Sequence, residues 1–136
     1  MDHKIKLALE LEALCRQADS RIQTVRSAQL SESITQIAML DSNGRQLEHS
    51  RSIYSASISC KAEHRGDSRM GGDYGFSTYL KELNLKTIAQ RAAESATELL
   101  GAGAAPTLSC PAVFRNDVMA DLMDFLSSSF SAEQVD

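Results

Sequence analysis

The chain has 136 residues, of which 43% are apolar and 24% are charged, and its formal net charge is −4 at pH 7. This composition is typical of one soluble domain whose core needs no metal or disulfide support. The negative charge and the 5% aromatic content disfavour direct nucleic-acid binding, because they provide neither a basic surface nor a stacking platform. No apolar run is long enough to cross a bilayer and no signal peptide is evident, so we expect a cytoplasmic protein without membrane contact.

The first segment has the pattern of an amphipathic helix. Apolar residues recur at helical spacing from Leu7 to Ala18, which predicts a helix over residues 3–19. The period then changes to two, so a sheet should follow and cover the apolar stripe of this helix.

We expect this sheet to be an antiparallel meander of three or four strands. It begins with a short strand near residues 22–28 and a second strand over residues 33–40. The sequence Asp-Ser-Asn-Gly at residues 41–44 predicts a hairpin turn. Alternating polarity over residues 54–63 predicts a long strand with one buried face, on which Cys60 lies.

A second turn, at residues 63–67, leads to another predicted strand. On it, every second residue from Tyr74 to Leu80 would lie on one face: Tyr74, Phe76, Thr78 and Leu80. The preceding Gly71-Gly72 pair indicates a bulge or a close approach of another backbone.

The C-terminal third begins with an alanine-rich helix over residues 85–100, which Gly101 ends. Pro111 precedes an apolar run at residues 112–114 that predicts a short strand, and Asn116 or Asp117 should cap a last amphipathic helix.

These elements predict an α+β fold, in which an antiparallel β-meander packs against helices and is followed by a short strand and a C-terminal helix. We divide the chain into a central α+β domain, residues 1–105, and the start of a following C-terminal region, residues 106–136.

The cysteines and histidines give few candidates for chemistry. Cys15, Cys60 and Cys110 match neither a disulfide framework nor a C-x-x-C motif, so we expect small buried apolar residues, with one disulfide pair as the alternative. Strand pairing could bring Cys60 beside His64 or His49 as nucleophile and base. Cys60 lies on the same strand face as the apolar residues Ile58 and Ala62, which argues against this pairing, because burial raises the pKa of a thiol.

The last helix carries Asp117, Asp121 and Asp124 at helical intervals. They could serve acid–base chemistry or hold a hard cation, but a solvated helix face is the preferred interpretation.

The order of these features resembles the TldD/PmbA family, whose members have been described as modulators of DNA gyrase and as metalloproteases. The resemblance rests on the order and spacing of six segments: residues 16–22, 41–44, 54–63, 71–76, 85–100 and 111–114. It covers nearly the whole chain and implies the central segment of a longer protein.

Catalytic, TldD-like members carry a His-Glu-x-x-x-His zinc motif on the helix after the short apolar strand. The family pattern places Asp124 and Ser129 where the two histidines would stand, and Phe125 where the glutamate would stand. Phe cannot act as a general base, and a serine hydroxyl is a poor zinc ligand. The resemblance therefore implies a TldE/PmbA-type subunit that offers no catalytic, cofactor or metal residue of its own, with zinc only in a TldD-like partner.

Three functions remain open from the sequence. The first is a structural and partner-binding segment of a TldD/TldE-like protease complex that acts on peptides, and self-association is possible. The second is an independent hydrolase or metal enzyme that uses Cys60 and His64. The third is a regulatory protein associated with gyrase.

Overall fold

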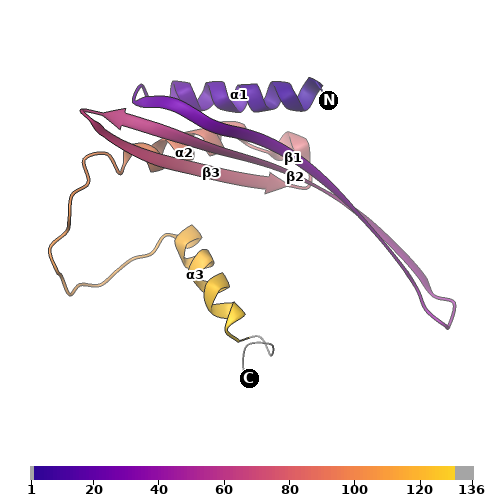
Figure 1. The fold of residues 1–136 in the computed structure, drawn as a ribbon. Coiled ribbons are helices and arrows are strands. Elements are labelled where there is room, and N and C mark those ends of the chain that lie inside the picture. The colour runs from indigo at the N-terminus through magenta and orange to yellow at the C-terminus, as the bar shows by residue number, and fades with distance from the viewer. Residues whose placement is uncertain (1, 131–136) are drawn as a thin grey trace. The chain divides into compact units, whose positions relative to one another are not determined.

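The computed structural model describes residues 2–130, which form an α+β fold, as predicted (Figure 1). The elements in chain order are α1 (Asp2–Ala18), β1 (Ile22–Leu40), β2 (Gln46–His64), β3 (Asp67–Ser77), a short 3-10 helix η1 (Leu80–Glu82), α2 (Leu85–Thr97) and α3 (Asn116–Ser128). The described residues fall into two compact units that divide between Gly103 and Ala104. No helix among them is long and apolar enough to cross a membrane.

The sheet is an antiparallel meander of three strands in the order β1-β2-β3. The expected break between strands at residues 22–28 and 33–40 is wrong, because β1 continues through both. Pairing with β2 has irregularities between Ile22 and Ser27 but is regular across the expected break, where Leu30 lies opposite Ala56. The charged residue in the middle, Glu32, is stabilised by an ion pair with Lys4 of α1, so it does not interrupt the strand.

The two hairpin turns have different chemistry. Between β1 and β2, the Asp41 carboxylate accepts hydrogen bonds from the main-chain N–H of Asn43 and of Arg45, and Gly44 has a φ of 77°. Between β2 and β3 the loop is two residues long, with φ of 50° at Arg65 and 86° at Gly66. Positive φ at both positions is the geometry of a type I′ turn, whose twist matches that of the strands.

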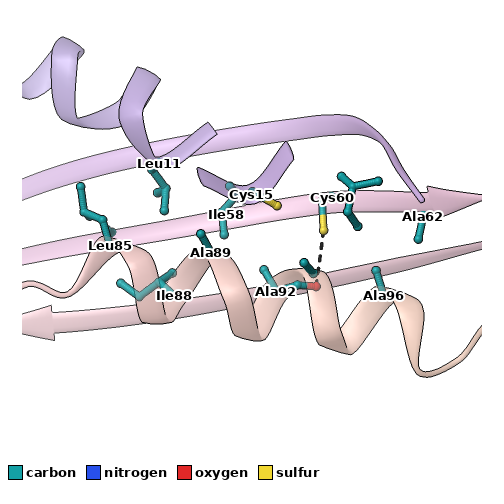
Figure 2. Close-up of a cluster of buried hydrophobic side chains, with 13 residues drawn as sticks. Leu11, Cys15, Ile58, Cys60, Ala62, Leu85, Ile88, Ala89, Ala92 and Ala96 are labelled. Carbon is teal, nitrogen blue, oxygen red and sulfur yellow. Dashed lines mark hydrogen bonds between the residues drawn. The ribbon is translucent and has the colours of Figure 1, made fainter. Parts of the chain in front are cut away.

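The hydrophobic core lies between one face of the sheet and the helices α1 and α2 (Figure 2). As alternation predicted, every second residue of β2 from Ala56 to Ala62 is buried, and Cys60 has no exposed surface. The alanine-rich stripe of α2 is buried as well. Small side chains on this helix allow its backbone to approach the sheet closely.

The closeness of α2 determines which face of β3 is covered. A Cβ atom at Gly71 would lie 2.3 Å from the main-chain nitrogen of Ala96, so only glycine fits there. The strand residues that face α2 are therefore Gly71, Asp73 and Gly75. Tyr74 and Phe76 point to the opposite face and are exposed, and the strand ends at Ser77, before Thr78 and Leu80.

The second unit differs from the sequence prediction in three respects. Residues 104–115 have no regular secondary structure, so the short strand expected at residues 112–114 does not form, and no described strand pairs with these residues. The cap of α3 is Arg115, with no side-chain cap hydrogen bond, rather than Asn116 or Asp117. Cys110 is exposed, contrary to the expectation that all three cysteines are buried.

Candidate functional surface

The structure separates the proposed nucleophile Cys60 from both histidines. Cys60 is fully buried, and its Sγ donates to the carbonyl oxygen of Ala92 at 3.4 Å. His64 is exposed at the far end of β2, four residues along the strand, which is about 13 Å at the rise of an extended strand. His49 is exposed still farther away. Neither imidazole can take a proton from the Cys60 thiol in this fold.

The neighbour of Cys60 is instead Cys15, on α1. Both thiols are free and fully buried. A hydrogen bond to Cys60, together with burial, raises the pKa of Cys15, while the same bond lowers the pKa of Cys60. Sequence spacing gave no sign of this pair, because α1 and β2 meet only through the tertiary fold.

The acidic residues of α3 do not converge on a site. Asp117, Asp121 and Asp124 are all exposed, and Asp117 forms an ion pair with Arg115. Hydrogen bonds from the Arg115 side chain and the Val118 N–H hold the pKa of Asp117 at about 2. A solvated face is therefore the interpretation that the structure supports.

The three residues that the resemblance places at the zinc positions also lie on this unit. Asp124 and Phe125 are exposed on α3, and Ser129 is its C-cap. Together they provide one carboxylate, one phenyl ring and one hydroxyl, a set that does not fit zinc. Within residues 2–130, no group of three or more His, Cys, Asp or Glu side chains is placed to hold a metal ion.

A groove of about 760 Å³ lies between α1 and the segment from η1 to the start of α2. Leu7 and Leu14 of α1 and Leu83 contribute apolar walls, while Glu10 and Lys81 contribute opposite charges. These mixed charges select no particular class of ligand.

The sheet face turned away from the helices carries exposed apolar side chains. On β3, Tyr74 is 70% and Phe76 is 71% exposed, and Met70 lies on the same face. Across from them, Ser55 and Ser57 of β2 pair with Phe76 and Tyr74. Small serine side chains leave the two aromatic rings uncovered.

This face continues onto a two-stranded arm. Tyr54 of β2 pairs with Ser77, the last residue of β3. From Tyr54 toward the β1–β2 hairpin, only β1 and β2 continue, and they extend past both helices (Figure 1). In this arm, residues 33–53, Met39 pairs with Leu47 and Ile37 pairs with His49. Residues that pair directly across two strands lie on the same face of the sheet. Because side chains alternate along a strand, these arm residues lie on the same face as Ser55 and Ser57, the face that the helices do not cover. We call this surface the open face; its exposed apolar residues are Ile37, Met39, Leu47, Met70, Tyr74 and Phe76.

Sequence reasoning missed the open face, although the sequence contains a signal for it. Gly71 and Gly75 share one parity, and Tyr74 and Phe76 share the other. The close approach of α2 leaves room only for glycine at position 71, so Tyr74 and Phe76, which have the other parity, lie on the opposite face. Large exposed apolar patches of this kind indicate an interaction surface.

The family is identified by comparison with known proteins. A model of the PmbA/TldA metallopeptidase central domain matches residues 1–100. The match spans most of the chain, so the chain belongs to the TldD/PmbA family, as the resemblance predicted. The matched part contains α1, the sheet and α2, which are the elements that carry the open face.

Two solved structures are similar to this chain. One, a proposed modulator of a DNA gyrase from Thermotoga maritima MSB8, has a TM-score of 0.71 at 21% identity, covering 78% of this chain and 24% of that chain. The other, of the same description and from Bacteroides thetaiotaomicron VPI-5482, has a TM-score of 0.59 at 29% identity, covering 74% and 23%. This chain therefore spans about a quarter of their length. The comparison with curated proteins finds no match.

Proposed function

We propose that this chain is the central segment of a TldE/PmbA-type subunit, which has no zinc site and pairs with a zinc-bearing, TldD-like subunit in a complex that cleaves peptides. Its role in that complex is to bind the partner and to build part of the assembly. Hydrolysis is carried out by the partner's metal.

Family membership and the side chains at the zinc positions support the non-catalytic part of this proposal. Imidazole and carboxylate are the groups that hold zinc and activate water in metalloproteases. Phe125 and Ser129 provide neither group. The sequence contains no histidine after His64, so a small change in alignment does not restore the motif.

The open face is the observation that carries the partner-binding part. Six large apolar side chains remain exposed on one side of the sheet, whereas α1 and α2 cover the other side over the core, from Ala56 to Ala62 of β2. An isolated two-stranded ribbon is only marginally stable in water. The arm, residues 33–53, therefore gains most of its stability when another surface packs against it.

Co-expression with a TldD-like protein from the same cell tests the proposal. We expect the two chains to co-purify and the complex to cleave unfolded peptides, with the activity lost on addition of a chelator. This chain alone should show no cleavage. Cleavage by the isolated chain, or failure of the two chains to associate, would contradict the proposal.

A further inference from the structure

Residues 33–40 of β1 form a free edge of the sheet. β1 is the outer strand in the order β1-β2-β3, and in the arm its neighbour is β2. All of these residues are exposed, and they lie in the part of the arm that projects beyond both helices (Figure 1). An outer strand leaves a row of main-chain N–H and C=O groups without a strand partner. This edge therefore has room for a further strand.

The edge at residues 33–40 has no charged side chain, unlike the other strand edges. The opposite edge of the arm, residues 46–53 of β2, carries Glu48 and Arg51, and β3 has three charged residues. Nearer the core, β1 itself has two charged residues and two register shifts. Charges and bulges prevent a strand edge from pairing with another chain. Residues 33–40 lack both protections, so strand pairing is expected here.

Apolar side chains lie on both faces of this edge. Ile37 and Met39 belong to the open face, while Ile34 and Leu40 lie on the other face, and the four are between 50% and 76% exposed. A strand that adds here must therefore offer apolar side chains on both of its faces. A second copy of the same residues does so, because directly opposed residues in an antiparallel pair share a face.

The apolar residues favour a particular register for two copies. With Ile37 opposite Ile37 of the second copy, Ile34 lies opposite Leu40 on the other face. A pairing centred on Gln36 instead puts Leu40 opposite Glu32. Directly opposed apolar residues stabilise a sheet, so the pairing centred on Ile37 is preferred.

We propose that residues 33–40 pair antiparallel with the same residues of a second copy of this chain, about a two-fold axis at Ile37. This pairing joins the two arms into a four-stranded sheet, which is more stable in water than a two-stranded ribbon. It goes beyond the proposed function and leaves both open faces uncovered, on the same side of the sheet. The charged outer edges prevent a third copy from adding, so the assembly closes at two chains.

The small size of this interface determines the expected affinity. Eight residues of extended strand span about 27 Å, and contact along a single edge buries well under the roughly 1,200 Å² that a stable interface needs. We therefore expect a weak dimer with a Kd of about 100 μM. Unfolding experiments at micromolar concentration then report on the single chain.

Engineered cysteines test the register, in the full chain with Cys110→Ser because Cys110 is exposed. The two Ile37 positions would be directly opposed, with Cα atoms about 5 Å apart, which a disulfide spans. The two Gln36 positions would be about 8 Å apart, which is too far. With oxidised glutathione, Ile37→Cys should give at least about 5-fold more linked dimer than the matched control Gln36→Cys. Equal yields, or no linked dimer from Ile37→Cys, would contradict the proposal.

Sedimentation equilibrium tests the pairing without a cross-link. The average mass of the Cys110→Ser chain should rise from one chain toward two between about 10 and 500 μM. Ile37→Lys sets two lysines directly opposite each other and should abolish this rise. Leu47→Lys puts the same charge on the same face, but on the β2 edge, and should keep the rise. Both variants should keep Tm within about 3 °C of the parent.

Two results would show that the proposal is wrong. One is a Cys110→Ser chain that stays single up to about 500 μM. The other is equal loss of the dimer in Ile37→Lys and Leu47→Lys, which would mean that the copies meet through the open face rather than through the edge. None of these measurements includes a TldD-like protein, so they are independent of the proposed function.

Discussion

Gly71 lies where α2 comes closest to the sheet, so even one added side-chain carbon would disturb the packing of this helix. A Cβ atom there would lie 2.3 Å from the nitrogen of Ala96 and 2.7 Å from the carbonyl oxygen of Ala92. Both are main-chain atoms, so the clash can be relieved only by moving the helix. We predict that Gly71→Ala lowers the free energy of unfolding by about 3 kcal/mol, measured by urea denaturation.

Two other glycines serve as controls for this prediction. A Cβ atom at Gly75 would meet Cδ1 of Ile88 at 2.9 Å, and that atom is the end of a side chain that can rotate. A Cβ atom at Gly103 would meet nothing within 4 Å. Gly75→Ala should therefore cost about 1 kcal/mol and Gly103→Ala close to nothing. An equal loss at all three positions would show that helix contact is not the cause.

Asp19 makes the stability of the chain depend on pH. Its carboxylate accepts two bonds from the Arg21 side chain, at 2.6 and 2.9 Å, and one from the Arg21 N–H. These bonds lower the pKa of Asp19 from 3.8 to about 2. Because the folded-state pKa is the lower one, the contribution is complete above the unfolded pKa and disappears as the pH falls from about 4 to about 2.

We predict that Asp19→Asn destabilises the folded chain by about 1 kcal/mol at pH 7, a value reduced for solvent screening of this partly exposed pair. Asparagine can keep the bond from the Arg21 N–H, but it loses the charge and the acceptor of the bond from Arg21 Nη2. The difference from the parent chain should shrink as the pH falls from about 4 to about 2 in thermal unfolding curves. A difference that does not change with pH would contradict the assignment.

At the scale of elements, the arm is separable from the core. No side chain of residues 36–50 is buried. Replacing these residues with Asn-Gly would join Thr35 to Arg51, which already pair across the ribbon, through a two-residue turn. We predict that this shortened chain keeps its free energy of unfolding within about 1 kcal/mol and loses binding to a TldD-like partner. A large loss of stability would mean that the arm belongs to the folding unit.

The elements that sequence predicts well are those whose patterning is local. Helical periodicity gave α1 and α2, and alternation gave the buried face of β2. The continuity of β1 was missed because residues 29–32 separate its two apolar runs; in the structure these residues pair with β2, and Glu32 forms an ion pair with Lys4 of α1. The short strand at residues 112–114 was predicted from propensity alone, and a strand without a pairing partner does not form.

The functional surface was harder to predict than the fold, for a similar reason. Tyr74 and Phe76 are exposed because α2 packs closely over Gly71 on the other face of β3. That contact forms only in the tertiary structure, so the sequence pattern does not show it. The Cys15–Cys60 contact likewise depends on how α1 lies across the sheet. The assignment of Phe125 and Ser129 to zinc positions, in contrast, rests on residue types and on the resemblance, and it stays a prediction.

At the scale of the molecule, one core supports the first unit. The buried apolar residues of its core all lie between Leu11 and Ala96. We therefore predict that a chain ending at Gly103 unfolds in one cooperative transition, with a free energy of unfolding within about 1 kcal/mol of the full chain. Loss of the cooperative transition in urea would show that the second unit is required for folding.

The central claim is that the open face binds a TldD-like partner, and a pair of matched variants tests it. Ile37→Thr/Leu47→Thr changes the open face of the arm, while Ile34→Thr/Leu40→Thr changes residues of the same types that are exposed on its other face. In calorimetric titrations with the TldD-like protein, we predict that the first variant binds at least about 10-fold more weakly, because two apolar anchors are lost, while the second stays within about 2-fold. Equal affinities of both variants and the parent chain would contradict the claim.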